Sequence, residues 1–199
     1  MPSKRNMCQA CQLPASRCIC TFASAISSNL SMSVLQHPDE QFHPKNTLRL
    51  AQLCLPSLKV FVGETAVDFS ALEQECAAPE VKPCVIFPTQ TSQALETVTT
   101  HQVNHLIFID ATWRKAFKIW SVNSWLHALP CYHFTRAPES QYHLRKTSRE
   151  HGLSSLEAIA YGLSLVDNVD VAALYATQHS WMEQKRAMMP KDIQKRYEP

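Results

Sequence analysis

The stretch His105 to Lys118, HLIFIDATWRKAFK, is the part of the sequence that indicates the fold class most clearly. Its first six residues are apolar up to a terminal carboxylate, Asp110, and they predict a buried β-strand. Residues 111–113 then turn into a basic amphipathic segment that predicts a helix. A carboxylate at the carboxyl end of a parallel strand lies where open α/β sheets bind their ligands. Asp110 is therefore the first candidate for an active-site residue.

The rest of the chain alternates short apolar runs with segments of helical spacing. Strands are predicted at 31–36, 59–62, 84–87, 105–110 and 131–135. Helices are predicted at 44–55, 70–77, 91–100, 113–120, 154–166 and 170–186. Ser70-x-x-Glu73 and Ser154-x-x-Glu157 have the pattern of a capping box at two helix starts. This alternation predicts an α/β domain with a mostly parallel sheet and helices on both of its faces.

Composition places the chain among soluble globular proteins. Its 199 residues are 45% hydrophobic and 18% charged, enough for one core and a small appendage. No stretch approaches the roughly 20 apolar residues that span a bilayer. Lys4 and Arg5 are not followed by an apolar run, so we expect no secretory signal and a cytoplasmic location.

The charge is unevenly distributed along the chain. Residues 21–110 hold 4 Lys/Arg and 9 Asp/Glu, whereas residues 112–151 hold 7 and 2, and residues 185–199 hold 5 and 2. The two basic segments suit a polyanionic partner. Solvated helix faces account for the same charges equally well.

Four of the eight cysteines lie within thirteen residues, with the spacing C-x2-C-x6-C-x-C. Four thiolates so close together can complete the tetrahedral shell of a structural Zn²⁺, and metal binding would supply folding free energy to this short segment. Residues 1–25 are therefore predicted to be a small zinc-binding module, and residues 26–199 the catalytic domain. Four free thiols in a disordered tail are the alternative. The four predicted zinc ligands are Cys8, Cys11, Cys18 and Cys20.

Glycine is scarce, with only three residues in the chain: Gly63, Gly152 and Gly162. No G-x-G-x-x-G or P-loop pattern follows any predicted strand. This argues against a common dinucleotide site, a Rossmann-type methyltransferase and an ATPase. A nucleotide-like cofactor would need a site built from other loops.

The segment after Asp110 has both functional and structural interpretations. Asp110 can accept a proton or orient a nucleophile, but it can also cap the next helix. Trp113 can stack on a base or pack in the core. Arg114, Lys115 and Lys118 can meet phosphates or form a solvated helix face.

Two further polar clusters accompany Asp110. His37 and Glu40 follow the strand 31–36 and should share its sheet edge with Asp110. Arg136 and Arg145 lie in a long polar connection and are reasonable anion ligands. Glu157 belongs either to this site or only to its capping box.

Taken together, these clusters resemble the DTW-domain family, whose D-x-T-W signature is present as Asp110-Ala111-Thr112-Trp113. The resemblance extends over nearly the whole chain. It includes Gln36-His37-Pro38-x-Glu40, Phe87-Pro88, Arg136, Leu144-Arg145-Lys146-Thr147-Ser148, Leu156-Glu157-Ala158 and the N-terminal cysteines.

The resemblance implies a tRNA-uridine aminocarboxypropyltransferase. Such an enzyme transfers the 3-amino-3-carboxypropyl group of S-adenosylmethionine to N3 of a tRNA uridine and releases methylthioadenosine. The bacterial members most similar to this chain act at position 47, in the variable loop. The resemblance also implies a SPOUT-like sheet with a C-terminal trefoil knot, and we expect a monomer.

The resemblance carries roles over to particular residues, with Asp110 as the catalytic one. Contacts to S-adenosylmethionine are expected from Phe87, Pro88, Thr112, Trp113, Arg136, Leu144, Ser155 and Glu157. Contacts to tRNA are expected from His37, Glu40, Arg114, Lys115, Lys118, Arg145 and Lys146.

Two rival functions remain at this point. A SPOUT-like RNA methyltransferase would share the fold and the donor but release S-adenosylhomocysteine. A non-catalytic, zinc-bearing RNA-binding protein would keep all its function without Asp110. A carboxylate at a strand end repels phosphate, which argues against the second rival.

Overall fold

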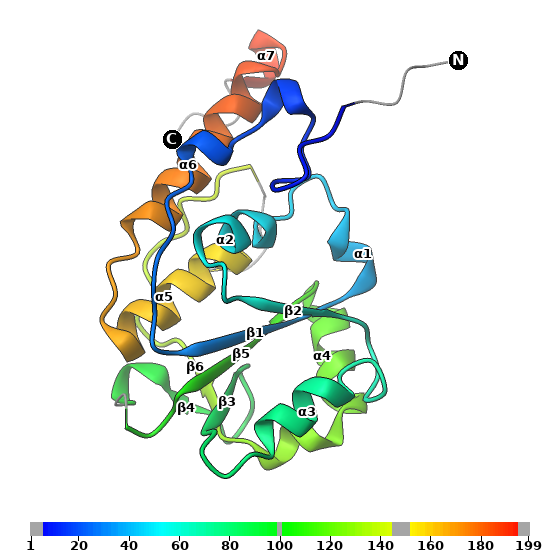
Figure 1. Cartoon of the computed structure of the whole chain (residues 1–199), viewed down its shortest axis with the longest axis vertical. Coiled ribbons are helices and arrows are strands. Elements are labelled where there is room, and N and C mark those ends of the chain that lie inside the picture. The colour runs from blue at the N-terminus through cyan, green and yellow to red at the C-terminus, as the bar shows by residue number, and fades with distance from the viewer. Residues whose placement is uncertain (1–5, 99–100, 145–151, 195–199) are drawn as a thin grey trace.

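The computed structural model describes residues 6–98, 101–144 and 152–194 (Figure 1). Its centre is a six-stranded sheet in the order β2-β1-β5-β3-β6-β4, and every neighbouring pair of these strands is parallel. The predicted α/β class with a parallel sheet is confirmed. The strands are β1 (Ser31–Gln36), β2 (Lys59–Val62), β3 (Pro83–Ile86), β4 (Gln93–Ala94), β5 (His105–Asp110) and β6 (Cys131–His133).

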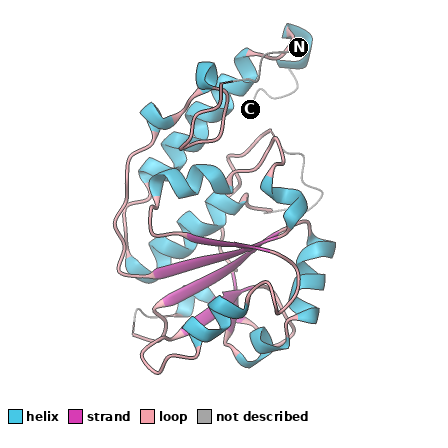
Figure 2. Ribbon diagram, turned by 45° about the vertical axis from the view of Figure 1, so that its right-hand side comes forward, coloured by secondary structure: helices cyan, strands magenta, loops and turns pink. Residues whose placement is uncertain are grey.

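Helices cover both faces of the sheet, as Figure 2 shows. The α-helices are α1 (Pro38–Gln41), α2 (Leu48–Cys54), α3 (Ser70–Cys76), α4 (Trp113–Val122), α5 (Ser155–Asp167), α6 (Ala172–Ala187) and α7 (Lys191–Gln194). Short 3-10 turns are η1 (Ala15–Arg17), η2 (Cys20–Phe22), η3 (Leu95–Thr97) and η4 (Ser124–Ala128). Among the described residues, no helix is long and apolar enough to cross a membrane.

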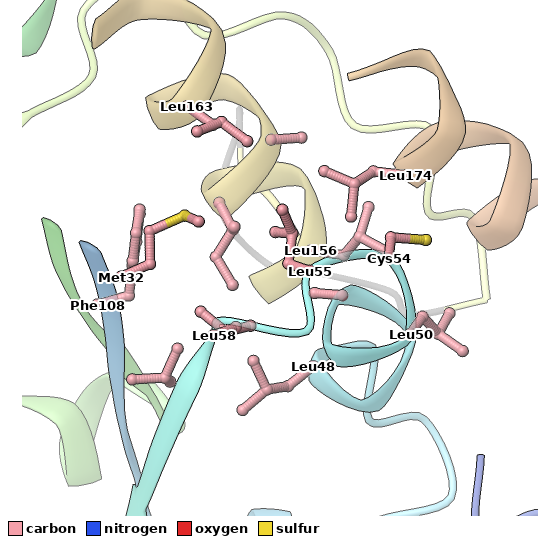
Figure 3. Packing of buried hydrophobic residues seen from close by; sticks show 14 of the residues in the cluster. Met32, Leu48, Leu50, Cys54, Leu55, Leu58, Phe108, Leu156, Leu163 and Leu174 are labelled. Carbon is pink, nitrogen blue, oxygen red and sulfur yellow. The ribbon is translucent and has the colours of Figure 1, made fainter. Parts of the chain in front are cut away.

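The side chains of the central strands pack alternately into two separate cores, because successive side chains of a strand point to opposite faces of the sheet. Met32 and Phe108 face the larger core, where they pack with leucines of α2, α5 and α6 (Figure 3). Leu35 and Ile107 face the smaller core, which α3, α4 and η4 close. A strand buried on both faces should be apolar throughout, and the run Leu106 to Ile109 of β5 meets this expectation. β1 also has the predicted bounds, although it buries Ser33, whose hydroxyl forms a hydrogen bond of 2.8 Å with His105 of β5.

Two predicted helices differ from the structure. Residues 91–100 were expected to form one helix, but their described part forms β4 and η3. The hydroxyl of Ser92 binds the backbone of Thr89 and closes a turn there instead. The helix predicted at 44–55 begins only at Leu48, because the Asn46 side chain accepts the Leu48 amide and donates to the Glu40 carbonyl.

The predicted capping boxes had opposite outcomes. Ser154 and Glu157 form both reciprocal bonds at the start of α5, so that prediction is confirmed. The box predicted at Ser70 is wrong, because the Ser70 hydroxyl donates to the Val67 carbonyl and Phe69 occupies the N-cap position.

The cysteine-rich segment lies against the main body of the chain. Cys11, Leu13 and Ile19 are buried in the larger core, and the Thr177 hydroxyl of α6 donates to the Phe22 carbonyl at 3.1 Å. The division into residues 1–25 and 26–199 stays a prediction.

Helix α5 approaches the sheet closely at Gly162, where an added β-carbon would lie 3.1 Å from Cζ of Phe108. We expect Gly162→Val to lower the free energy of unfolding by about 1–3 kcal/mol, because this packed contact must shift. Urea denaturation measures the change. The control is Ser164→Val, which places valine at a half-buried position of the same helix. An equal loss in both variants would contradict the close approach.

Candidate active site

A cavity of about 600 Å³ opens at the carboxyl ends of β5, β3 and β6. Its volume is that of a small-molecule site, and its position is the one at which parallel sheets bind ligands. The walls come from the ends of these strands, the start of α4, the connection after β6 and the start of α5. The polar and aromatic lining residues include Phe87, Asp110, Thr112, Trp113, Tyr132, His133, Thr135, Ser140, Tyr142, Ser154 and Ser155.

Asp110 lies in the wall of this cavity, with its carboxylate held from two sides. The parallel register places Gln36 of β1 directly beside Asp110 of β5, and Gln36 Nε2 donates to Asp110 Oδ2 at 2.7 Å. Ser155, the first residue of α5, donates its hydroxyl to Asp110 Oδ1 at 2.5 Å. Both donors are neutral, so they orient the carboxylate without neutralising its charge. Asp110 is the last residue of β5, as predicted, and its catalytic role stays a prediction.

Five predicted cofactor contacts line the cavity together with Asp110. They are Phe87, Pro88, Thr112, Trp113 and Ser155. The ring centroids of Phe87 and Trp113 lie 6.4 Å apart, so the two rings form one aromatic wall.

Glu157 is placed behind the cavity wall rather than in it. The side chain is buried, and its two oxygens accept four bonds of 2.7–3.0 Å: from the Ser140 hydroxyl, the Gln141 amide, the Ser154 amide and the Gln178 amide group. These four bonds give each oxygen of the Glu157 carboxylate two hydrogen-bond donors from the protein itself. We therefore revise the role of Glu157 from cofactor contact to anchor for the cavity residues Ser140 and Ser154.

The other predicted cofactor contacts do not line the cavity. Leu144 is buried in the larger core, and its carbonyl accepts from Lys45 Nζ. Arg136 is exposed beside the cavity, while its neighbours Thr135 and Ala137 form part of the wall. Two of the predicted tRNA contacts, Arg145 and Lys146, lie outside the described residues.

Glu96, which the sequence analysis missed, fixes the wall after β6. Its carboxylate accepts the amides of Thr135 and Arg136 at 2.9 and 2.8 Å and the Thr135 hydroxyl at 3.0 Å. The Tyr161 hydroxyl of α5 donates to the same carboxylate and to the Arg136 carbonyl. Partial burial opposes the ionisation of Glu96, but the bonds from Arg136 and Thr135 outweigh it and hold its pKa below the usual value.

His37 and Lys118 meet at Glu64 beside the backbone of Asp110, outside the residues that line the cavity, and we call this cluster the rim. The His37 amide donates to the Asp110 carbonyl, which joins this rim to β5. His37 Nδ1 accepts the Asp39 amide, so its Nε2 is the atom that donates to Glu64 at 3.0 Å. Lys118 Nζ lies 2.6 Å from the second Glu64 oxygen, and the bond from Lys118 is the largest cause of the lowered pKa of Glu64. His37 therefore braces the rim.

The remaining predicted tRNA contacts lie at the same end of the molecule. Lys115 of α4 forms an ion pair of 2.7 Å with Asp39. Arg114 is exposed on α4, and Glu40 is half-buried in α1.

The four N-terminal cysteines have the geometry of a metal-binding cluster. Their sulfur atoms all lie within 4.8 Å of one another, and three of the Sγ–Sγ distances are 3.5, 3.7 and 3.9 Å. A tetrahedral zinc with bonds of about 2.3 Å would hold its sulfurs about 3.8 Å apart, so the cluster fits this ion. Gln12 adopts the left-handed conformation, with φ of 55°, and turns the chain back after Cys11. Within the cluster, the amides of Cys11 and Ala10 lower the pKa of Cys8 to about 6, whereas burial raises the pKa of Cys11 and raises that of Cys20 to about 12.

The chain is similar over most of its length to known proteins of one family. A family model described as the DTW domain matches residues 5–188. Proteins from Macaca fascicularis and Drosophila melanogaster, each named tRNA-uridine aminocarboxypropyltransferase 2, are 27% and 28% identical to the chain over 174 and 177 residues. A Mus musculus protein of the same name is 25% identical over 171 residues. No solved structure matches the chain.

These matches include most of this chain but a smaller share of the relatives. The matched regions are 83%, 84% and 82% of the chain for the macaque, fly and mouse proteins. They are 58%, 69% and 57% of those proteins. The chain thus spans less than two thirds of the length of the macaque and mouse relatives.

The contacts of Glu96 predict how it contributes to stability at different pH values. Its pKa is lower in the folded than in the unfolded chain, so its stabilisation is complete above the unfolded value of about 4.3 and is lost as the pH falls through the folded value. Glu96→Gln should therefore unfold at lower urea concentration than the wild type at pH 7, and the difference should shrink at pH 3.5. The exposed Glu73→Gln is the control. A difference that is unchanged between the two pH values would contradict the role of the ionised carboxylate.

Proposed function

The chain belongs to the DTW-domain family, and we propose that it is a tRNA-uridine aminocarboxypropyltransferase. The proposed reaction moves the 3-amino-3-carboxypropyl group of S-adenosylmethionine to N3 of a uridine in tRNA. One observation carries the proposal: Asp110 of the D-x-T-W signature lines a cavity of about 600 Å³ with its carboxylate held in place. The names of the three relatives support it.

The proposed chemistry requires a proton acceptor beside N3 of the uridine. N3 carries a proton and becomes a good nucleophile only when this proton leaves. The new bond joins N3 to the methionyl γ-carbon, the carbon–sulfur bond breaks, and methylthioadenosine departs as a neutral thioether. Methyl transfer would use a different carbon of the same sulfonium, so the outcome depends on how the donor is positioned.

Asp110 and Ser155 are the residues that we assign to this proton. Both line the cavity, and the Ser155 hydroxyl already donates to the Asp110 carboxylate. Ser155 Oγ can accept the N3 proton while its own proton passes to Asp110, which leaves both groups hydrogen-bonded. Gln36 keeps the carboxylate aligned during this transfer.

The cavity walls suggest where each of the two reactants binds. The aromatic wall of Phe87 and Trp113 suits the stacking of a flat ring. The exposed guanidinium of Arg136, beside the wall residue Thr135, is our candidate for the methionyl carboxylate, which an arginine can bind through two hydrogen bonds. A flipped-out uridine suits a loop of tRNA, where unstacking costs least.

Several finer assignments belong to the same proposal. The target is a variable-loop uridine, position 47, and the protein acts as a cytoplasmic monomer. The fold is SPOUT-like with a C-terminal trefoil knot. Residues 145–151, which connect the cavity wall to α5, lie outside the described residues. The basic residues Arg114, Lys115, Lys118, Arg145 and Lys146 hold the tRNA backbone.

We also propose that the cysteine cluster holds a structural Zn²⁺. The sulfur spacing and the packing of Cys11 into the larger core support this assignment. The four sulfurs complete a tetrahedral shell, so the ion would stabilise the fold without an open position for chemistry.

An RNA methyltransferase is the rival function, and the by-product distinguishes the two. We expect wild-type protein to release methylthioadenosine, and Asp110→Ala to lower the rate of product formation at least about 100-fold while tRNA still binds. Ser155→Ala should cause a smaller loss, because Asp110 remains. Mass spectrometry of tRNA nucleosides and by-products after incubation with S-adenosylmethionine measures both. Asp170→Asn, remote from the cavity, is the control. Release of S-adenosylhomocysteine, or full activity of Asp110→Ala, would overturn the proposal.

The zinc proposal is tested separately by metal analysis. Purified protein should contain one zinc ion per chain, and Cys18→Ser should lose the ion and unfold at a lower temperature, because metal binding contributes to folding. The matched control is Cys131→Ser, a half-buried cysteine outside the cluster, which should keep its zinc. Equal zinc content in both variants would refute the assigned ligands.

A further inference from the structure

Helix α4 presents two large aromatic side chains to solvent where it leaves the cavity. Trp113 is 46% exposed and Phe117 is 63% exposed. Residues four apart lie on the same face of a helix, so the two rings are neighbours along its axis. Trp113 also lines the cavity, which makes Phe117 the next aromatic position outside its mouth. Aromatic rings of this size are less favourable in water than when they are buried against a partner. Two such rings side by side therefore indicate a binding surface.

Cations lie beside these aromatic residues. At about 100° per residue, Arg114 and Lys118 follow Trp113 and Phe117 around the helix. The opposite side, with Ala116 and Ile119, is buried in the smaller core. The helix contains three cationic residues and no Asp or Glu. We call Trp113, Phe117, Arg114 and Lys118 the aromatic–basic face.

The ion pairs that residues of α4 form do not prevent this face from binding an anion. Lys118 pairs with Glu64, but its side chain is 60% exposed, and water and salt weaken an exposed ion pair, so Lys118 can exchange this partner for a phosphate. Lys115, which pairs with Asp39, lies farther from Phe117 around the helix axis than Lys118 does. The charge beside Phe117 therefore comes from Arg114 first and from Lys118 second.

We propose that the aromatic–basic face binds the tRNA nucleotide next to the target uridine, with its base stacked on Phe117 and its phosphate near Arg114. This inference rests on the proposed function. A uridine turned into the cavity leaves the neighbouring base without its stacking partner. An exposed aromatic ring replaces that partner for any base, and nearby cations meet the phosphate. The face thus contributes tRNA affinity without fixing the sequence.

The first test measures tRNA binding without S-adenosylmethionine, so that no reaction occurs. Phe117→Ala should raise the Kd of a tRNA transcript about tenfold, in line with the loss of one base-stacking contact. Phe117→Tyr keeps an aromatic ring and should bind as the wild type does. Val122→Ala is the matched control, because Val122 is 46% exposed on the same helix but points about 140° away. Arg114→Gln should reduce the salt dependence of binding, while Phe117→Ala should not.

The second test identifies the base that stacks. Two synthetic tRNAs each carry an abasic site, on the 5′ or the 3′ side of the target uridine. The effect of Phe117→Ala should disappear on one of them and remain on the other. Equal binding of Phe117→Ala and wild type on intact tRNA, or a full effect on both abasic tRNAs, would overturn the proposal. So would a wild-type dimer that Phe117→Ala converts to a monomer in sedimentation, because a second chain would then cover the face.

Failure of the proposed function gives a different result. Wild-type protein would then form no modified uridine by mass spectrometry, even where Phe117→Ala weakens tRNA binding. Conversely, normal product with unchanged Kd and KM in Phe117→Ala leaves the proposed function intact and refutes only the aromatic–basic face.

Discussion

The carboxylate of Asp110 joins three elements that are far apart in the sequence. It ends β5, accepts the Gln36 side chain of β1 and accepts the Ser155 hydroxyl at the start of α5. The register of β1 against β5 is fixed by side chains that alternate between two cores, so a shift by one residue would turn Asp110 away from its partners. The position of the proposed proton acceptor therefore depends on the packing of the whole sheet.

Three acidic residues near the cavity have different surroundings, and these determine their roles. Glu157 is buried and accepts four hydrogen bonds from the protein, while Glu96 binds the backbone of the wall after β6. Both hold loops in place. Asp110 is half-buried, lines the cavity and accepts from two neutral side chains, one of which also lines the cavity. A carboxylate in that position can exchange a proton with a ligand, whereas Glu157 is enclosed by the fold.

The sequence predicted those parts of the fold that local pattern determines. The bounds of β2 and β5 follow from their apolar runs, and the start of α5 follows from its capping box. Patterns over a few residues do not reveal contacts between distant segments. Glu96 acts on residues 39 and 40 positions later, so nothing near it marked its role. The family resemblance assigned Glu157 and Leu144 to the cofactor site, but neither residue lines the cavity: Glu157 is held by four hydrogen bonds within the fold, and Leu144 packs in the larger core.

The proposed reaction requires the donor and the uridine to meet beside Asp110 in this cavity. The most direct test is a crystal structure of the chain with S-adenosylmethionine and a uridine-containing tRNA fragment. We predict that uridine N3 lies about 3–3.5 Å from the methionyl γ-carbon and within hydrogen-bond reach of Ser155 or Asp110. A donor bound elsewhere on the chain, or a uridine that approaches the cavity with N3 directed away from both residues, would contradict this mechanism.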